Sequence, residues 1–448
     1  MSDTAELPKT PTDHYHLRCL ASGEVLHDRR NGEDQFPLSA PGTTGAFLRS
    51  EYRSRRFVVG PREEGLFRFS SWLPVVRRLS DSGSPVSYHA TSLGHRLGLK
   101  NLWVTFSGWW PERGAEIPTG TFKENEAFAV YGRMGSAATR NTLVVASAGN
   151  TARAFLRVAT TNDLPLVVVV PEQNLRDLWT VGHRGSSTVV VAAGEGSDYS
   201  DAISLAGLLC KDPHFLAEGG AKNVARRDGM GTTFLSATHE IGEIPHHYFQ
   251  AVGSGTGAIA AWEANLRLRA DGRFGDRLSR LHLAQNAPFQ VLVDSWNARS
   301  RDLVLPPDDE VRRQVSEIGA QVLANRRPPW APVGGLFDAL HDTDGHMYAV
   351  SNREAAAAAA LFAESEGIDV SPAAAVAVGS LVQAVEQGAL GADEIVNLNI
   401  TGGGYLRARQ ELETFALEPD IVAGSDLFSP ERIADAVRNV QTTHIHLA

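Results

Sequence analysis

Short apolar runs alternate with helical patterns over most of this chain, and that alternation limits the folds it can adopt. The run LPLVVVVP (164–171) is continuously apolar, which is typical of a strand buried on both faces of a parallel sheet. Before it, NTLVVASAG (141–149) leads into TARAFLRVATTND (151–163), whose apolar residues recur at helical spacing. After it, STVVVAAG (187–194) repeats the strand pattern. We therefore expect an α/β protein with mainly parallel sheets.

The second half of the chain continues this pattern. Residues 246–270 predict a strand, a glycine loop and a helix, and PFQVLVDS (288–295) predicts another strand. IVNLNITGGG (395–404) predicts a strand that runs into a glycine turn. Ligands of such sheets bind at the carboxyl ends of the strands, so the loops that follow the strands are the first candidates for a site.

Composition excludes several classes of protein. A length of 448 residues predicts two domains or one large one. The net charge of −10 comes without a basic stripe, so we expect no nucleic-acid partner. We expect no membrane partner and no secretory signal, because no apolar run approaches membrane-spanning length and the first twenty residues lack a basic segment followed by an apolar core. The only cysteines, Cys19 and Cys210, favour a reducing, cytoplasmic location.

Among the loops that follow predicted strands, SAGNT (147–151) opens a helix. The backbone N–H groups of such a loop favour an anion. Asn150 adds an amide that both donates and accepts hydrogen bonds. The alternative is plain helix capping by Asn150 or Thr151.

The loop GSGTG (253–257) carries three glycines that allow the backbone to approach a ligand, and the following helix offers its N-terminus to a phosphate. The loop also satisfies a loose dinucleotide fingerprint. That fingerprint needs an acidic residue about 20 residues further on, and the next predicted strand ends at Asp294, about 40 residues away. We therefore favour a phosphate loop, and a tight turn without a ligand is the remaining alternative.

A single lysine, Lys123, follows a turn of small residues in PTGTFKENEA (118–127), at the start of a predicted helix. TGGGY (401–405) places a hydroxyl, Thr401, at the end of a late strand. Pyridoxal phosphate requires an amine for an imine, backbone donors for its phosphate and a partner for its ring nitrogen. A lone TFKE would indicate a solvated lysine, but together with these loops it predicts pyridoxal phosphate as the cofactor.

The order and wording of these motifs resemble the fold-type II pyridoxal-phosphate enzymes, the group of tryptophan synthase β and threonine synthase. The similar segments span about residues 64–405. Within the group, the stretch around Trp109, Trp110 and NVARRDGMG (223–231) is most similar to the cysteate synthase family. The resemblance implies two open-sheet domains with the cofactor in the cleft between them.

The resemblance also implies a role for each loop. Lys123 would form the Schiff base with the cofactor as the catalytic residue, Asn150 would bind the ring hydroxyl, and Thr401 would face the ring nitrogen. The cofactor phosphate would be held by Gly253, Ser254, Gly255, Thr256 and Gly257.

Substrate binding is expected from two sets of residues. By the same resemblance, the substrate carboxylate would be bound by Ser147, Ala148, Gly149, Asn150 and Thr151. Three arginines in the similar segments are candidates for anionic groups, with surface ion pairs as the alternative: Arg113, Arg226 and Arg227.

The reaction implied by the resemblance is a β-replacement in which O-phospho-L-serine and sulfite give L-cysteate and phosphate through an aminoacrylate intermediate. A neutral hydroxyl at the ring nitrogen leaves the ring largely unprotonated, which favours rapid loss of the leaving group. The residues leave the nucleophile open, so threonine synthase activity or another β-replacement of phosphoserine is an alternative. The rival classes are a non-catalytic binding protein and a nicotinamide oxidoreductase.

The domain division that we expect has three parts. Residues 1–62 would form an N-terminal extension, 63–127 with 247–448 a large cofactor-binding domain, and 128–246 a small domain that closes over the substrate. Threonine synthase relatives often begin with a cysteine-rich metal knuckle, but Cys19 stands alone in LRCLASGE (17–24), so we expect no metal site. We expect small-molecule substrates and a homo-oligomer.

Overall fold

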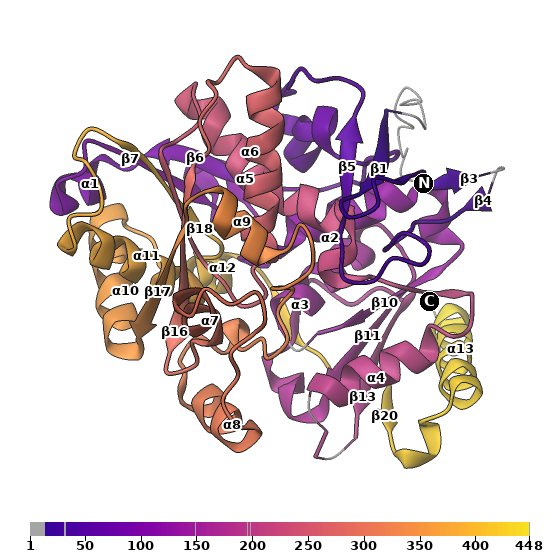
Figure 1. Ribbon diagram of the computed structural model, residues 1–448. Helices are drawn as coiled ribbons and strands as arrows, with labels where there is room; N and C mark the ends of the chain where they lie inside the picture. Colours follow the sequence, from indigo (N-terminus) through magenta and orange to yellow (C-terminus); the bar gives the residue numbers. More distant parts are fainter. Residues whose placement is uncertain (1–13, 31–32, 148, 195, 198, 448) are drawn as a thin grey trace.

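Two sheets of parallel strands organise the protein (Figure 1). The computed structural model describes residues 14–447 apart from 31–32, 148, 195 and 198. In the larger sheet every neighbouring pair is parallel except the antiparallel edge pair β6–β7. Its strands are, in spatial order, β17 (His346–Ser351), β16 (Arg280–Ala287), β15 (His247–Ala251), β18 (Ile395–Ile400), β7 (Asn101–Phe106) and β6 (Val86–His89).

The smaller sheet is parallel throughout. Its central strand, β11 (Leu166–Pro171), is buried at every position, as its continuous apolar run predicted. Its strands are, in spatial order, β14 (Phe215–Ala217), β10 (Thr142–Ala146), β11, β13 (Thr188–Ala193) and β20 (Ile421–Ala423). The expected α/β architecture with mainly parallel sheets is therefore confirmed.

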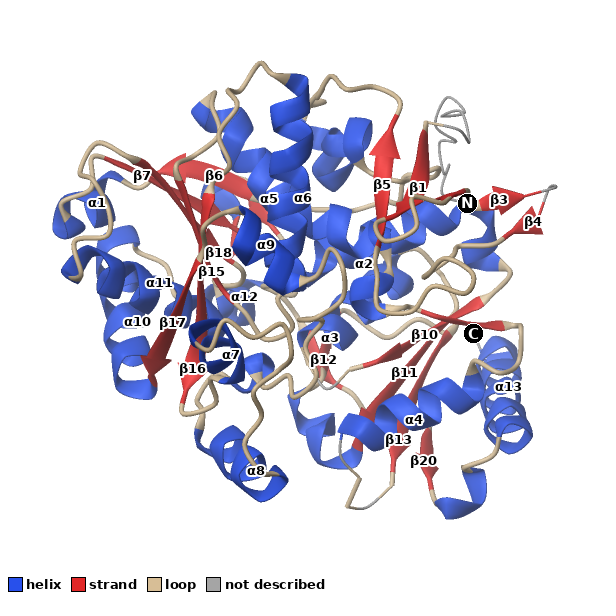
Figure 2. Cartoon of the chain, viewed as in Figure 1, coloured by secondary structure: helices blue, strands red, loops and turns tan. Residues whose placement is uncertain are grey.

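Helices cover both sheets (Figure 2). On the larger sheet, α11 (Pro372–Glu386) packs against β15, β16, β17 and β18, and α10 (Asn352–Glu366) packs against α11. On the smaller sheet, α4 (Tyr199–Leu209) and α3 (Asn150–Thr161) both pack against β10, β11 and β13. No helix in the described part of the chain is long and apolar enough to cross a membrane.

One expected strand is wrong. Residues Val291–Asn297 form the helix α7, whereas the run 288–295 predicted a strand. The side-chain oxygen of Gln285 accepts hydrogen bonds from the backbone N–H groups of Leu292 (2.7 Å) and Val293 (3.4 Å), which satisfies donors in the first helical turn. The preceding residues, RLHLAQNA (280–287), form β16 instead, and their polar side chains hid the strand from pattern analysis.

Two segments pack against a sheet other than the one that their expected domain contains, and the domain division itself stays a prediction. Strand β20 pairs with β13, and α13 (Pro430–Leu447) packs against α4 and β13, so 421–447 lies with the smaller sheet and not with the larger one. Helix α5 (Val224–Ile241) packs against β6 and β7, so it lies with the larger sheet although the expected small domain included it. Both placements are set by pairing and packing across long sequence separations, which local patterns do not report.

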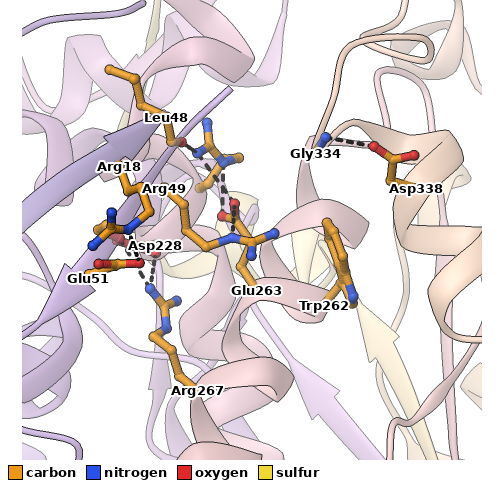
Figure 3. A network of polar contacts seen from close by, with 12 residues as sticks. Arg18, Leu48, Arg49, Glu51, Asp228, Trp262, Glu263, Arg267, Gly334 and Asp338 are labelled. Carbon is orange, nitrogen blue, oxygen red and sulfur yellow. Dashed lines mark hydrogen bonds and ion pairs between the residues drawn. The ribbon is translucent and has the colours of Figure 1, made fainter. Parts of the chain in front are cut away.

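The N-terminal extension contributes a small antiparallel sheet formed by β1 (Tyr15–Cys19), β2 (Val25–Leu26) and β5 (Leu48–Tyr52). Buried charges attach β5 to α5 and to α6 (Thr256–Asp271). The carboxylate of Asp228 accepts hydrogen bonds from the hydroxyls of Ser50 and Tyr52 and from Nη1 of Arg267, the last at 2.7 Å. Figure 3 shows Arg267 directed at Asp228 and Arg49 directed at Glu263.

Arg227 connects the same elements from the interior. It is fully buried, and its Nε lies 2.9 Å from Oε2 of Glu263. Its terminal nitrogens donate to the backbone oxygens of Ala221 and Leu48. Burial raises the pKa of Glu263, but Arg227 and Arg49 oppose it and hold the pKa of that carboxyl below its usual value.

We predict that Arg227→Met destabilises the protein. The carboxylate of Glu263 stays buried when its main partner is lost, and breaking such a pair costs about 3–5 kcal/mol. Thermal or urea denaturation of the purified variant measures the loss. The matched control is Arg18→Met, because Arg18 pairs with the partly exposed Glu51 and its loss is expected to change stability little. Equal effects of the two substitutions would contradict the prediction.

Candidate active site

The turn before Lys123 is held in place from two sides. Gly120 has a left-handed φ of 68°, and a Cβ there would lie 2.6 Å from the ring of Tyr405, so glycine is required. The carboxylate of Glu124 accepts hydrogen bonds from the backbone N–H (2.8 Å) and the hydroxyl (2.6 Å) of Thr119. Lys123 begins α2 (Lys123–Met134) directly after this turn. The lysine therefore starts from a backbone with a defined conformation.

Backbone hydrogen bonds join this turn to the carboxyl end of β18. The N–H of Phe122 donates to the oxygen of Thr401 at 3.0 Å, and the N–H of Gly403 donates to the oxygen of Gly120 at 3.1 Å. Thr401 is 8% exposed. The structure thus brings together the lysine turn and the late hydroxyl, which are far apart in the sequence.

The amine of Lys123 is surrounded by protein. Its Nζ lies 3.1 Å from Oε2 of Glu126 and 3.7 Å from the sulfur of Met230, and its side chain is 17% exposed. Burial lowers the pKa of Lys123, and the charge of Glu126 opposes that effect only in part. The amine is therefore more easily neutral than that of a surface lysine, as a base or a nucleophile requires.

Arg226 contacts Glu126 and connects it to a second carboxylate, Glu218. Its Nε lies 3.3 Å from Oε2 of Glu126, and its Nη1 donates to Oε2 of Glu218 at 2.7 Å. Burial raises the pKa of Glu218, although Arg226 lowers it. We call the set Lys123, Glu126, Arg226 and Glu218 the charge cluster. All four side chains are largely buried.

Lys123 and Arg226 were expected site residues, whereas the two carboxylates of the charge cluster were not. Glu126 follows Lys123 by three residues on a predicted helix, so helical spacing could have placed it on the same face. Nothing in the sequence signals Glu218. It reaches the cluster because the chain turns sharply at residues 219–222, just before α5 begins.

The Asn loop, residues 147–151, follows β10 and includes the first two residues of α3. The side-chain oxygen of Asn150 accepts a hydrogen bond from Nη2 of Arg153 at 2.5 Å. Because an arginine can only donate, the amide NH2 group of Asn150 must point elsewhere, where it can donate to a ligand oxygen. Nη2 of Arg153 also lies 3.4 Å from the hydroxyl of Tyr405, and its guanidinium lies 4.8 Å from the centre of the Trp179 ring.

Tyr405 connects the Asn loop to the lysine turn, since its ring also packs against Gly120. Arg153, Trp179 and Tyr405 were not among the expected site residues. Arg153 lies in the quoted motif TARAF, at the position where its side chain can reach back to Asn150, so its spacing of three was an available signal.

Among the expected substrate-binding residues, Ala148 lies outside the described residues. Thr151 is buried in the first turn of α3, and the hydroxyl of Ser147 accepts from the N–H of Gly149 at 3.4 Å.

The glycine loop 253–257 leads from β15 into α6. Gly255 has a φ of 75°, and a Cβ there would lie 2.5 Å from Leu336. A Cβ on Gly257 would lie 3.1 Å from the ring of Phe122, the residue before Lys123. The hydroxyls of Ser254 and Thr256 lie 2.8 Å apart at the start of the helix. The loop thus combines hydroxyls, close backbone approach and a helix N-terminus beside the lysine, which suits a phosphate group.

These groups fit pyridoxal phosphate. The Asn loop, the glycine loop and Thr401 each follow a parallel strand, and backbone hydrogen bonds join the turn before Lys123 to the carboxyl end of β18. Each group has the chemistry that one part of the cofactor requires: an amine for its aldehyde, donors for its phosphate, and polar partners for its ring.

Two of the expected anion-binding arginines lie outside this arrangement. The guanidinium of Arg227 is occupied by Glu263 and by two backbone oxygens, so its placement does not support a role in substrate binding. Arg113 is exposed and lies over the rings of Tyr88 and Trp110, 4.0 Å and 4.6 Å from their centres. Of the three arginines expected to bind anions, Arg226 is the one that belongs to the charge cluster.

Fold and site together define a pyridoxal-phosphate-dependent enzyme, and comparison with known proteins agrees. Residues 113–402 match the family model of pyridoxal-phosphate dependent enzymes. The processed form of threonine deaminase isoform 2 from Solanum lycopersicum has a similar structure, with a TM-score of 0.52 at 17% identity, covering 73% of this chain and 86% of that one. Maize serine racemase also gives a TM-score of 0.52, at 13% identity over 73% and 91% of the two chains. The expected fold type and cofactor are confirmed.

Proteins with higher sequence identity to this chain indicate which family of pyridoxal-phosphate-dependent enzymes it belongs to. A cysteate synthase of Methanocorpusculum labreanum is 48% identical over 402 residues, which is 89% of this chain and 95% of that protein. A cysteate synthase of Methanosarcina barkeri is 45% identical over 407 residues, which is 91% of this chain and 96% of that protein. The chain belongs to the cysteate synthase family. The resemblance inferred from its motifs is therefore confirmed, and so is its assignment as an enzyme.

We predict that Glu126→Gln lowers the pKa of Lys123. The carboxylate favours the ammonium form, so its removal makes the amine neutral at lower pH. An aldehyde forms an imine only with a neutral amine, so with Lys123 as the cofactor lysine the inflection in a plot of pyridoxal-phosphate uptake rate against pH should move to lower pH. The visible absorbance of the bound cofactor reports the uptake. Glu116→Gln, at an exposed position on β9 (Ala115–Glu116), is the control and should leave the inflection in place. A shift to higher pH in Glu126→Gln would contradict the prediction.

Proposed function

We propose that this enzyme catalyses a β-replacement in which O-phospho-L-serine and sulfite give L-cysteate and phosphate through an aminoacrylate. The observation that carries the proposal is the pair of backbone hydrogen bonds between the Lys123 turn and residues 401–403. They bring the residue with the buried amine and the residue with the neutral hydroxyl to one sheet end, beside a phosphate-sized glycine loop. The chain's membership of the cysteate synthase family supports the choice of substrates.

Pyridoxal phosphate, when bound, supplies an aldehyde for an amino group and a ring that withdraws electrons from the α-carbon. In the proposal Lys123 holds the aldehyde, the amide NH2 of Asn150 donates to the ring hydroxyl, and the loop 253–257 binds the phosphate. The hydroxyl of Thr401 would be the partner of the ring nitrogen. Because a hydroxyl does not protonate that nitrogen as an aspartic acid would, electron density stays available to expel the leaving group at the β-carbon.

Lys123 is also the base that removes the α-proton from the bound substrate. Burial favours its neutral amine before the transfer, and the carboxylate of Glu126, 3.1 Å away, stabilises the ammonium that results. Burial thus acts on the lysine before the proton transfer, and the charge of Glu126 acts on it afterwards. The charge cluster therefore allows the lysine to accept a proton without being protonated beforehand.

Substrate, nucleophile and leaving group are all anions, and Arg226 is the proposed cation that binds them. Its charge is shared between Glu126 and Glu218. Burial makes the neutral form of Glu218 more accessible, and neutralising that carboxylate would release Arg226 to pair with a phosphate or sulfite oxygen. Arg113 stays a candidate at the surface, but no contact connects it to the charge cluster within the described residues.

Domain closure is part of the same proposal. The Asn loop belongs to the smaller sheet, and the glycine loop and Thr401 belong to the larger one. A substrate whose carboxylate is bound by residues 147–151 and whose amine is held at the cofactor would bridge both units, so it would favour a closed form that excludes water. The expected homo-oligomer and cytoplasmic location remain predictions.

We predict that the purified enzyme forms L-cysteate and phosphate in equal amounts from O-phospho-L-serine and sulfite, and that Lys123→Ala abolishes both products. Lys123→Ala should also lose the cofactor's visible absorbance while its far-UV circular dichroism is unchanged. The product assay should include sulfide and water in place of sulfite, and a phosphorylated homoserine as the threonine synthase substrate. Threonine formation, or phosphate release without cysteate, would contradict the proposed reaction.

We predict that Thr151→Val weakens phosphoserine binding and raises the fraction of substrate that ends as pyruvate. The hydroxyl lies in the first turn of α3, where the proposed carboxylate site is, and a looser closed form would admit water to the aminoacrylate. Cofactor affinity should stay near that of the parent enzyme, because the substituted group lies on the substrate side. Thr161→Val, at the other end of the same helix, is the control. Normal substrate affinity with no extra pyruvate would exclude the bridging role of this loop.

A further inference from the structure

A cavity of about 480 Å³ lies between the N-terminal extension and the helical segment η1 (Arg62–Trp72). It shares no residue with the candidate active site. Three arginines line it, Arg53, Arg68 and Arg78, together with one glutamate, Glu64. Its volume is in the range of small-molecule sites, which is about 300–1,000 Å³.

Arg68 differs from Arg78, which pairs with Glu64, because it forms no ion pair with another described residue. The residue is 8% exposed, and its Nε has no hydrogen-bond partner among the described residues. The guanidinium lies over the ring of Phe69, 5.3 Å from its centre. Burial lowers the pKa of Arg68, although the charge of Glu240 opposes that effect. A buried charge in such surroundings is unfavourable unless a counter-charge reaches it.

Other buried arginines of this chain show the contrast. Arg133 donates to the carboxylate of Asp28, with Nε at 2.7 Å and Nη2 at 2.6 Å. Arg227 donates to Glu263 at 2.9 Å. In both, a carboxylate of the chain satisfies the guanidinium in the interior. At Arg68, the cavity lies where a pairing carboxylate would otherwise be, and a ligand can enter it.

The rest of the lining adds positive charge and hydroxyl groups. Arg78 pairs with Glu64 at 2.8 Å, so the one acid among the described lining residues is engaged by another arginine and forms no ion pair with Arg68. Ser54, Ser70 and Ser71 also line the cavity. The hydroxyl of Ser71 donates to the oxygen of Val58 at 2.7 Å and fixes the neighbouring wall.

We propose that this cavity binds a small molecule that carries a tetrahedral oxyanion, a phosphate monoester or a sulfonate, with Arg68 at the anionic group. The guanidinium presents several N–H donors in a planar fork that matches such oxygens. The site is separate from the catalytic one, and the proposal does not depend on the reaction proposed above. Phosphate and sulfonate share the same recognition chemistry, so the experiment has an arm for each.

Calorimetric titration of the holoenzyme, in buffer without phosphate or sulfate, tests the proposal with inorganic phosphate and methanesulfonate as probes. Arg68→Met keeps an apolar side chain of similar length and removes the charge. We expect it to weaken binding of the preferred probe by about 10- to 100-fold, the range for a hydrogen-bonded charge. Arg62→Met is the matched control, since Arg62 lies on the same segment with a side chain 66% exposed, and it should change the affinity less than about twofold.

A third variant separates this site from the catalytic one. Arg226→Met removes the cation proposed for the active site, and the binding lost in Arg68→Met should persist in it. Thermal melting gives an independent readout: without anions Arg68→Met should melt no lower than the parent, because an unfavourable buried charge is gone, and the anion should raise the melting temperature of the parent only. Binding lost in Arg226→Met but kept in Arg68→Met would overturn the proposal.

The location of the anion is tested on the unaltered chain. Crystals of the holoenzyme grown without phosphate or sulfate and soaked with selenate should show an anomalous peak within hydrogen-bond distance of the Arg68 guanidinium. Its absence in Arg68→Met crystals would support the site. No peak at Arg68 in the parent enzyme, or a carboxylate of the same chain occupying the place of the anion, would overturn the proposal.

Discussion

Three consecutive charged residues at the start of α5 hold the rest of the structure together, because each is paired in a different direction. Successive side chains on an α-helix are rotated by about 100°. Arg226 accordingly reaches Glu126 beside the lysine, Arg227 reaches Glu263 on α6, and Asp228 reaches Arg267 and the hydroxyls of β5. A single helical turn thus connects the active site, the helix of the glycine loop and the N-terminal extension. A buried charge is stable only when paired, so these contacts also limit how the three parts can pack.

The candidate site uses burial in two ways. Around Lys123, low exposure favours the neutral amine, and one nearby carboxylate keeps the ammonium within reach. Around Glu218, the same burial favours the neutral acid beside Arg226. Both effects arise from desolvation acting on opposite charges. Burial therefore disfavours the charged form of both residues, which is the property that the proposed proton transfer and anion binding would use.

Local patterns predicted the elements that they describe directly. The strand 164–171, the loop that starts α3, the glycine loop that starts α6 and the lysine at the first position of α2 all lie where the sequence indicated. The strand predicted for residues 288–295 was wrong because a side chain from outside the run, Gln285, accepts hydrogen bonds from the N–H donors of the helix that forms there. Glu218 and Tyr405 were missed for a related reason: each reaches the site through a turn or a contact with a distant segment, and no spacing rule reports such contacts.

The sequence by itself determined the α/β class, the cofactor and the family, because these depend on periodicity and on short motifs whose chemistry is local. Only the tertiary structure decided which arginine lies beside the lysine. Arg226 and Arg227 are neighbours with the same charge, and no sequence rule separates them. The orientation of α5 turns one toward Glu126 and the other toward Glu263, and the free energy of pairing each buried charge with its own carboxylate determines which one remains beside the lysine.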